Sequence, residues 1–496
     1  MRLRLVLAVV GRMLRLFTVG MLGPLFIAGI DGAWRSFAVY LGCGLGGALV
    51  GTVMSIGYER PRLLHRSEAM GIVAGTWLAT AVLAALPFCF YGLSFWDALF
   101  ESMSGLTTTG ATVLVDFTLY DRAFFFWRGL IQWIGGLGVI ALFLVILPRL
   151  GIAGRQLFFA ESSSAPGDAV SPQVRDAAGR LWLLYIGFTA LCTAALMVAG
   201  LGWFDALTNT FGTLAAGGFS PHGLSIAGYQ NPAAEWVLIL FMHLAGASFP
   251  LQLKVFTGQD WRGFFKDEEF LVYTAVMLAC GVGAAAVNTG GLPGLDALRA
   301  GLFQSSSLIS STGFASEDFN LWSDGAKMWL LIAMVVGGCA GSAGGGPKVV
   351  RHIITGRLIL REIAQTLHPR AVLPIRYNGR GVPDGVMRAV VTLTTLYVGF
   401  AFLFGLIYVW MGKDPITAFT ASLACIGNIG PGFNEVGPMG NFSGFSDLGT
   451  VLLTFQMWIG RLEILTVIAL LHPHTWRSLR WQDPPPAARA GSGPRG

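Results

Sequence analysis

Several long stretches of the chain are apolar and carry no charged side chain over the length that spans a lipid bilayer. They occupy residues 69–91, 181–201, 270–295 and 389–412. About 20 consecutive apolar residues form a helix long enough to cross the hydrocarbon core. A transmembrane barrel would instead show segments of about 10 residues in which apolar and polar positions alternate. The pattern therefore predicts transmembrane helices and an all-α membrane protein.

Four shorter segments recur between the long stretches and share one plan. They read WDALFESMSGLTTTGATV, FDALTNTFGTLAAGGFS, LDALRAGLFQSSSLISSTGFAS and KDPITAFTASLACIGNIGPGF. Each opens with an aspartate, a preferred helix N-cap, and reaches a glycine that marks the helix end. The aspartates are Asp97, Asp205, Asp296 and Asp414, and the glycines are Gly110, Gly217, Gly313 and Gly430. The separations of 13, 12, 17 and 16 residues predict that the last two helices are about one turn longer.

Such short helices cannot cross the bilayer, so the chain has to turn back inside the membrane. That is tolerated only where the irregular backbone lines a protein cavity or water. The C-terminal end of each helix carries partial negative charge, and exposed carbonyl groups can replace the hydration shell of a cation. Any one of these glycines alone is an ordinary helix C-cap, whereas four repeats favour a cation pathway.

Composition and charge agree with a multi-pass membrane protein. Hydrophobic residues make up 54% and charged residues 12% of the chain, and its mean hydropathy is +0.63. Soluble domains have about 25% charged residues. The six cysteines lie mostly in apolar runs without zinc-ligand spacing, and we interpret them as small buried hydrophobes. The sequence has no GxxxxGK[ST] phosphate loop, so it predicts no organic cofactor in this chain.

The distribution of Lys and Arg predicts the orientation, because cytoplasmic loops carry the excess. The basic clusters are Arg2, Arg4, Arg12 and Arg15; Arg60, Arg62 and Arg66; Arg149, Arg155, Arg175 and Arg180; Lys254, Arg262 and Lys266; residues 348–380; and Arg477 and Arg480. With alternating spans all of them fall on one side, which places both termini in the cytoplasm. The net charge of +6 then indicates topology and contact with anionic lipid, and nothing suggests nucleic acid. Residues 478–496 are predicted to be a disordered cytoplasmic tail.

Beyond the short segments, three long motifs carry a resemblance to a known family. They are WIGGLGVIALFLVILPRLG, GGCAGSAGGGPKVVR and MWIGRLEILTVIALLHPHTWR. With them the chain resembles, over nearly its whole length, the Trk/Ktr/HKT superfamily of potassium transporters and especially its TrkH-like branch. The resemblance implies ten transmembrane helices: two N-terminal helices and four helix–pore loop–helix repeats in a pseudo-fourfold arrangement. The implied units are residues 1–66, 67–155, 178–262, 268–362 with an intramembrane gating loop, 385–477, and the tail 478–496.

The resemblance implies that the four short segments form a potassium filter. Its residues are Thr108, Thr109, Gly110, Ala216, Gly217, Thr312, Gly313, Asn428, Ile429 and Gly430. Family members with serine at the first glycine position tend to favour sodium, so Gly110 implies potassium. The second and fourth segments depart from the pattern, because Ala215-Ala216 and Asn428-Ile429 stand where the first and third have hydroxyl side chains.

Two further features interrupt apolar spans. Residues 341–348, GSAGGGPK, cannot form a regular helix because three glycines precede a proline. Arg461 places a charge in the last span, which costs at least about 2.5 kcal/mol unless it meets water or a partner. Snorkelling or a salt bridge with Glu463 would satisfy it, although Glu463 faces another side of a helix. The resemblance implies a gate made of Gly344, Gly345, Gly346, Lys348 and Arg461.

The sequence thus predicts potassium uptake through a carbonyl filter, with potassium as the transported ion. The alternatives are a proton- or sodium-coupled symporter of the same fold, or a poorly selective potassium/sodium channel. Inverted repeats of a secondary transporter are disfavoured because all four segments share one orientation. An enzyme is disfavoured because the apolar windows hold neither a nucleophile with its base nor paired carboxylates. The resemblance also implies a homodimer, a TrkA-like cytosolic nucleotide-binding regulatory subunit, and the bacterial inner membrane.

Overall fold

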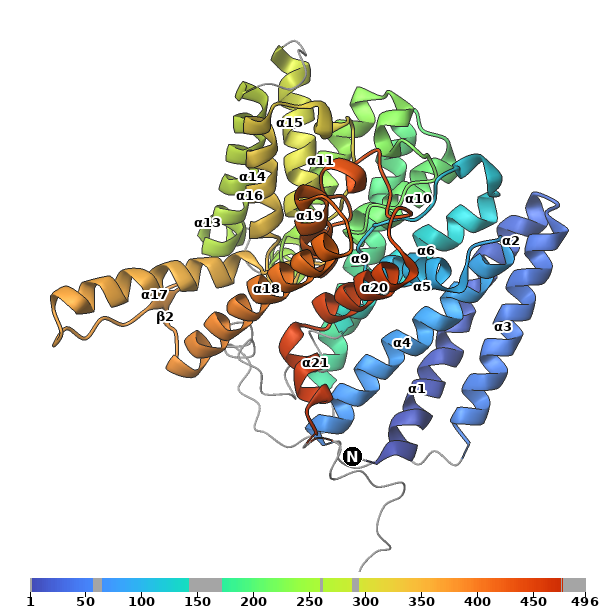
Figure 1. Ribbon diagram of the computed structural model, residues 1–496, viewed down its shortest axis with the longest axis horizontal. Coiled ribbons are helices and arrows are strands. Elements are labelled where there is room, and N and C mark those ends of the chain that lie inside the picture. Colours follow the sequence, from blue (N-terminus) through green and yellow to red (C-terminus); the bar gives the residue numbers. More distant parts are fainter. Residues whose placement is uncertain are drawn as a thin grey trace, which may run out of the picture.

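The protein is built almost entirely of helices that pack side by side, with one long helix projecting from the body (Figure 1). The computed structural model describes residues 2–56, 65–141, 172–258, 262–287, 294–473 and 475. The predicted tail at residues 478–496 lies outside the described residues, as do Arg60, Arg62, Arg149, Arg155, Arg477 and Arg480. In the described parts the strands are β1 (Arg376–Tyr377) and β2 (Arg380–Gly381), which pair as a small antiparallel hairpin.

Six helical spans among the described residues are long and apolar enough to cross a membrane. They are Leu3–Ile30, formed by α1 (Leu3–Thr18), η1 (Val19–Met21) and α2 (Leu22–Ile30); α3 (Trp34–Met54); α4 (Arg66–Phe90); α9 (Pro172–Val198); α14 (Glu268–Val287); and α18 (Asp384–Trp410). Large apolar side chains such as Leu45, Val198 and Phe402 are exposed on these helices, as expected for surfaces that face lipid. The prediction of a helical, integral membrane protein is confirmed.

Three other segments that read as apolar spans contain a break. Helix α11 (Pro232–Gly246) bends by 106° into α12 (Phe249–Phe256), and α20 (Asp447–Arg461) bends by 109° into α21 (Ile464–Leu471). If each bent pair counts as one span, the described residues hold up to eight. Helices α16 (Asp324–Val336) and α17 (Val349–Leu367) are separated by residues 337–348, here called the Gly-rich loop, which is not helical, as predicted.

The break after α20 corrects the predicted place of Arg461. This residue does not lie within a continuous span, because it is the last residue of α20. The next helix starts after Glu463, whose φ of 63° no regular helix contains. A side chain at a helix end can reach a neighbouring loop, whereas one in mid-helix is confined to the helix surface.

Four short helices lie between the longer ones. They are α5 (Phe95–Leu106), α10 (Trp203–Leu214), α15 (Gly294–Ile309) and α19 (Pro415–Ile426). Each packs against the long helix before it in the chain: α4, α9, α14 and α18 respectively. Each also contacts a helix that belongs to another part of the chain: α5 contacts α20, α10 contacts α6 (Arg122–Ala141), α15 contacts α11 and α19 contacts α16.

The predicted helix starts are correct only in part. Asp414 is the N-cap of α19, and its side chain accepts a hydrogen bond from Thr417 N. Helix α5 is instead capped by Ser94, and Asp97 lies in its first turn, as do Asp205 in α10 and Asp296 in α15. The helix α15 has 16 residues and is longer than α5 and α10, as predicted, but α19 has 12 residues, as do α5 and α10. The prediction of a longer fourth helix was wrong because the four aspartates do not occupy one position.

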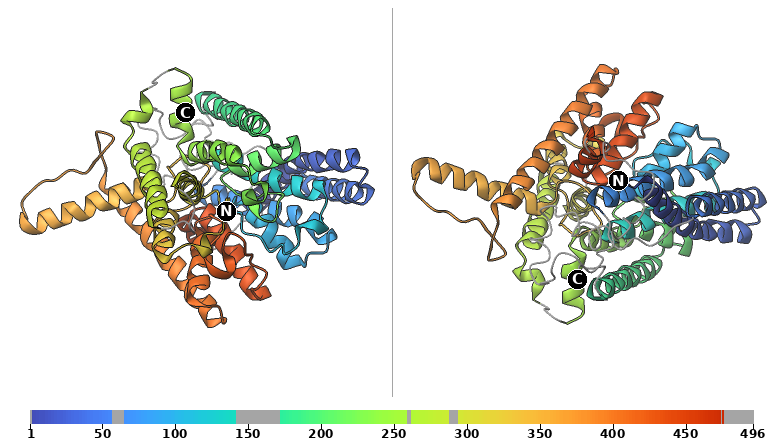
Figure 2. Two further views of the ribbon diagram at one scale, coloured as in Figure 1. Left: turned by 90° about the horizontal axis from the view of Figure 1, so that it is seen from above. Right: turned by 90° about the horizontal axis from the view of Figure 1, so that it is seen from below.

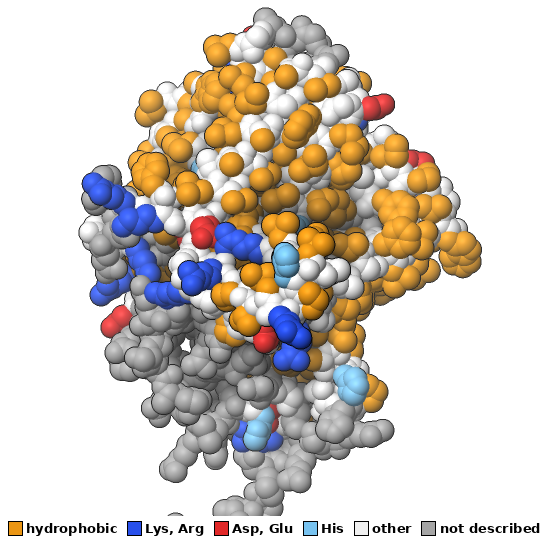
Figure 3. Space-filling view, turned by 90° about the vertical axis from the view of Figure 1, so that its left-hand side faces the viewer, with side chains coloured by type: hydrophobic (Ala, Val, Ile, Leu, Met, Phe, Trp, Pro, Cys, Tyr) orange, Lys and Arg blue, Asp and Glu red, His pale blue; other side chains and the backbone are white. Residues whose placement is uncertain are grey.

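A projecting arm, residues 349–383, consists of α17, the hairpin and the chain between them (Figure 2). Seen from the side of the arm, hydrophobic side chains cover the upper part of the molecule, and Lys and Arg side chains gather below them (Figure 3). Exposed arginines of the arm include Arg370, Arg376 and Arg380. The small helix α13 (Gly263–Lys266) precedes α14, whose first residues meet the hairpin.

Candidate functional site

The four short helices end in turns with the same backbone conformation. The turns comprise residues 108–110, 216–218, 311–313 and 428–430, here called the first to fourth turns. The first residue of each has a positive φ of 51–57°: Thr108, Ala216, Ser311 and Asn428. The backbone N–H of the second residue then donates to a carbonyl five positions earlier in each helix, at 2.8–2.9 Å: Thr109 to Ser104, Gly217 to Gly212, Thr312 to Ser307 and Ile429 to Ala424.

This common geometry corrects the alignment of the second turn. The residue that corresponds to Gly110 is Gly218, one position later than predicted, with φ of 71° against 82° in Gly110. Gly217 occupies the position of Thr109 instead. The error arose because Gly217 and Gly218 are adjacent in the sequence, and either could mark the helix end. All ten predicted filter residues nevertheless lie in the four turns. The two remaining residues of the turns, which were not predicted, are Gly218 and Ser311.

The third residues of the turns form a closed ring of backbone contacts. A Cβ atom added to Gly110 would collide with the carbonyl oxygen of Gly217, and one on Gly218 with that of Thr312. One added to Gly313 would collide with the carbonyl oxygen of Ile429, and one on Gly430 would lie 2.8 Å from that of Thr109. Each turn therefore packs against the next, and the fourth packs against the first. Only glycine permits this close approach.

The first and third turns are supported by one kind of side chain, and the second and fourth by another. In the first turn Thr107 and Thr109 share a hydrogen bond of 2.8 Å, and in the third Ser310 and Thr312 share one of 2.7 Å. The second turn has no such pair. There the amide of Gln132, from α6, donates to Gly217 O at 2.5 Å and accepts from Phe219 N at 3.0 Å.

The fourth turn is held by an amide of its own. The Nδ2 of Asn428 donates to Thr109 Oγ1 and to Met457 O, both at 3.0 Å. Asn428 thus links the fourth turn to the first, and amides support the two turns that lack hydroxyl pairs. Sequence analysis missed Gln132, although an amide in the apolar run RGLIQWIGG was a usable signal.

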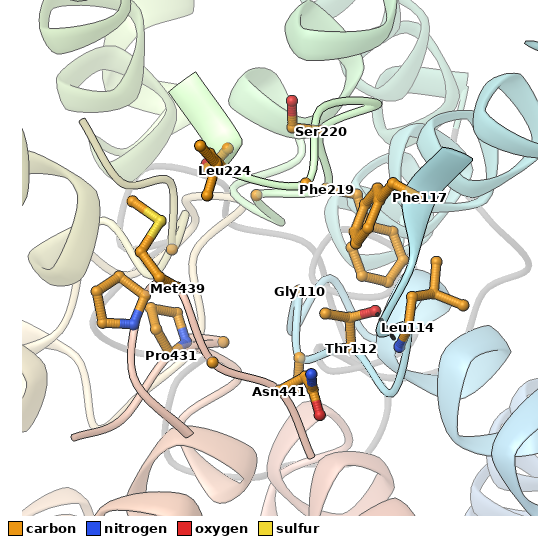
Figure 4. Close-up of a pocket in the computed structure, with 18 of the residues that line it drawn as sticks. Gly110, Thr112, Leu114, Phe117, Phe219, Ser220, Leu224, Pro431, Met439 and Asn441 are labelled. Atoms are coloured by element: carbon orange, nitrogen blue, oxygen red, sulfur yellow. Dashed lines mark hydrogen bonds between the residues drawn. The ribbon is translucent and has the colours of Figure 1, made fainter. Parts of the chain in front are cut away.

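A cavity of about 540 Å³ opens onto the ring from one side (Figure 4). Gly110, Ser220 and Pro431 border it, from three different parts of the chain. Arg128, which also lines the cavity, forms an ion pair with Glu101, with 2.6 Å between Arg128 Nη2 and Glu101 Oε1; the side chains are 2% and 0% exposed.

This ion pair holds the backbone that follows two of the turns. Glu101 Oε2 accepts a hydrogen bond from Val113 N at 3.2 Å, and Arg128 Nη1 donates to Ser220 O at 3.3 Å. The guanidinium of Arg128 also lies 3.9 Å from the ring centre of Phe219. Charged residues inside the apolar stretches ALFESMS and FFFWRGL could have indicated both residues, which sequence analysis did not consider.

On the other side of the ring, the Gly-rich loop lies directly against the third and fourth turns. Gly345 N donates to Ser311 Oγ at 2.5 Å, and a Cβ atom on Gly345 would collide with Gly427 O. Lys348 Nζ donates to Gly344 O inside the loop. Arg461 Nη1 donates to Ala343 O at 2.9 Å, so the last residue of α20 binds the backbone of the loop.

All five predicted gate residues line one small cavity of about 40 Å³: Gly344, Gly345, Gly346, Lys348 and Arg461. Glu463 lines the same cavity but pairs with Arg351 at 2.5 Å. Arg461 is only 6% exposed, so its charge is buried beside a second buried cation, Lys348. The salt bridge between Arg461 and Glu463 that the sequence left open is not formed.

Side-chain metal ligands do not gather in the described part of the chain, where no group of three or more His, Cys, Asp or Glu could hold a metal ion. The polar groups that converge are backbone carbonyls and hydroxyls, which suit a weakly held monovalent cation.

Comparison with known proteins decides the family. Residues 61–476 match the TrkH family, described as cation transport proteins. The chain belongs to the TrkH family. It is 34% identical to the Trk system potassium uptake protein TrkH of Halomonas elongata, over 96% of this chain and 100% of that protein. It is 33% identical to the protein of the same name from Escherichia coli, with the same coverage.

A solved TrkH structure has the same fold. The crystal structure of the potassium transporter TrkH from Vibrio parahaemolyticus superposes with a TM-score of 0.87 at 32% identity, covering 96% of this chain and 100% of that one. The predicted resemblance is therefore confirmed. Because TrkH proteins are transport proteins by name, the prediction of a transporter rather than an enzyme is confirmed as well.

Proposed function

We propose that this TrkH-family protein takes up potassium across the bacterial inner membrane through the ring formed by the four turns. The observation that carries the proposal is the closed ring of backbone contacts, in which each glycine packs against the carbonyl of the next turn. Carbonyl oxygens at the ends of four helices replace the hydration shell of a cation, and helix dipoles favour its positive charge. The relatives named as potassium uptake proteins support potassium as the ion.

The architecture that we propose for this path has ten transmembrane helices, two at the N-terminus and eight in four repeats around a pseudo-fourfold axis. The packing of the short helices supports it, because each contacts its own long helix and one helix of another repeat in cyclic order. The four turns, with one shared hydrogen-bond pattern, support it independently.

We further propose that the Gly-rich loop closes this path. The loop lies against the third and fourth turns and is held by Arg461. A potassium ion that leaves the ring would meet the buried charges of Lys348 and Arg461, and like charges repel strongly where water is scarce. Displacement of the loop together with these side chains would open the path.

The remaining parts of the proposal concern orientation and regulation. We place the cavity of about 540 Å³ outside the cell and the arm in the cytoplasm, with both termini. The inside-negative potential then supplies roughly 2.3 kcal/mol per charge for each 100 mV. Homodimer formation and a TrkA-like cytosolic regulatory subunit are part of the proposal, because the relatives belong to a Trk system.

The test is cation uptake into proteoliposomes that hold the purified protein, under an imposed inside-negative potential. We expect potassium and rubidium to enter and sodium to be excluded. In Gly110→Ser the new side chain collides with the second turn, so sodium exclusion should be lost. The matched control is Gly92→Ser, since Gly92 also has a positive φ of 103° but has open space around it.

Two outcomes would contradict the proposal in different ways. Sodium that enters the wild-type protein as readily as potassium would contradict the selective filter. Uptake that needs a proton or sodium gradient, and not the potential alone, would assign the protein to the coupled symporters.

A further inference from the structure

A buried carboxylate holds both ends of the Gly-rich loop. Glu269, the second residue of α14, is 3% exposed. Its Oε1 accepts hydrogen bonds from Ala340 N at 2.8 Å and from Val350 N at 3.0 Å. These two amides lie on either side of residues 341–349, which include most of the loop, so one oxygen atom fixes the distance between them.

The second oxygen of the same carboxylate faces the arm. Glu269 Oε2 accepts a hydrogen bond of 3.4 Å from the hydroxyl of Tyr377, which lies in β1 of the hairpin and is 8% exposed. Hydrogen bonds to a charged group are stronger than those between neutral groups, and a buried carboxylate without its partners is costly. The orientation of this carboxylate therefore depends on both the loop and the hairpin.

The hairpin is anchored to the same end of α14 by its neighbours. The side chain of Asn378 donates to Asp267 Oδ2 at 2.9 Å and accepts from Glu268 N at 2.9 Å. Arg357 of α17 forms an ion pair of 2.7 Å with Glu268. The start of α14 is thus the point where the arm joins the body.

Packing connects the same parts. One cluster of buried apolar residues contains Ala340 and Val350, on either side of the loop, together with Ile375 and Tyr377 of the arm. Well-packed interiors transmit small displacements rather than absorbing them. A shift of the hairpin consequently reaches the loop through the packing and through the carboxylate.

We infer that Glu269 is a positioning residue that ties the Gly-rich loop to the hairpin of the arm, so that the closed position of the loop depends on where the hairpin lies. Its effect on transport rests on the proposed function of the loop as a gate. The inference adds a mechanical link between an exposed part of the molecule and the ion path.

Amide hydrogen exchange of the full-length protein in lipid nanodiscs tests the link without any ion flux. Tyr377→Phe removes only the hydroxyl that faces Glu269. Loss of one hydrogen bond of ordinary strength should make exchange at Ala340 and Val350 about fivefold faster. The matched control is Tyr40→Phe, which removes another buried tyrosine hydroxyl, one that donates to Ala123 O in the N-terminal part of the molecule.

Two variants of the carboxylate separate positioning from general stability. Glu269→Gln keeps an oxygen for both loop amides and an N–H₂ group for the tyrosine oxygen, so exchange near the wild-type rate is expected. Glu269→Leu removes every acceptor and should exchange at least as fast as Tyr377→Phe. If the leucine variant does not fold, Tyr377→Phe, which lacks a single oxygen atom, still decides the test.

Unchanged exchange at Ala340 and Val350 in Tyr377→Phe would overturn the inference, as would equal acceleration in Tyr40→Phe. Rubidium uptake into proteoliposomes should rise in Tyr377→Phe, because a loosely held loop closes the path less completely. Faster exchange without a change in uptake would support the link and contradict the proposed gate, so the two can fail separately.

Discussion

The four turns share one backbone conformation but differ in the side chains that support them. The first and third turns carry hydroxyl pairs, whereas the second relies on Gln132 from another helix. A filter that excludes sodium needs carbonyls fixed at one spacing, or at least restrained in number and orientation. Gln132 therefore belongs to the selectivity proposal although it lies outside the turns.

Replacing Gln132 by leucine should impair selectivity specifically. The change leaves Gly217 O and Phe219 N without this partner, at about 1–3 kcal/mol for each buried group that stays unsatisfied. We expect sodium to enter proteoliposomes alongside rubidium. Gln456→Leu is the matched control, because buried Gln456 bonds to Tyr408 and Ser422 and, among the described residues, to no residue of the four turns. Equal sodium exclusion by the two variants would refute the role of Gln132.

At the residue scale, sequence analysis located the turns but not the buried polar side chains that bind them. Gly110, Gly313 and Gly430 each lie at the third position of a turn, where the recurrence of glycine at helix ends led us to expect them. The second turn was misplaced by one residue, since Gly217 and Gly218 are adjacent and only hydrogen bonding distinguishes them. Gln132, Glu101 and Arg128 were missed because a local pattern does not reveal which distant backbone a buried polar side chain meets.

The Gly-rich loop contains a glycine, Gly345, that has no room for a side chain. Gly345→Ala would bring a Cβ atom against Gly427 O, so the loop could not keep its position against the fourth turn. Overpacking of this kind costs about 1–3 kcal/mol, and at the middle of that range rubidium uptake through the protein should rise roughly thirtyfold. The measurement is uptake at a fixed potential.

A second glycine gives the control for this experiment. Gly356 lies in α17, and an added Cβ atom there would meet nothing within 4 Å. Gly356→Ala should therefore leave uptake unchanged. A rise of the same size in both variants would show that the position of the loop does not limit transport.

Long helices were predictable from continuous apolar runs, but breaks within such runs were not. Helices α4, α9 and α18 match the predicted windows, while the window at residues 270–295 ran past the end of α14 at Val287. The bends after Gly246 and Arg461 were not foreseen, because the apolar pattern continues across them. They depend on contacts with the Gly-rich loop, such as that of Arg461 with Ala343.

For the whole molecule, the proposed orientation can be measured directly. Arg370→Cys in the arm should react with a membrane-impermeant maleimide only in inside-out vesicles. Ser443→Cys, exposed near the cavity that we place outside, should react only in right-side-out vesicles. Of the six native cysteines, five are buried and Cys89 is partly buried, so the background should be low. Labelling of both positions from one side would contradict the proposed orientation.

The ring is closed by parts of the chain that are synthesised far apart in time. Asn428 of the fourth turn bonds to Thr109 of the first, 319 residues earlier. At a synthesis rate of about 5–20 residues per second, the fourth turn is made on the order of 15–60 s after the first. A nascent chain that stops short of α19 has only three of the four turns, so the ring is open and cannot yet enclose a cation. The proposed ion path is therefore incomplete until the fourth turn has been synthesised, so an unfinished chain would not leak ions through it.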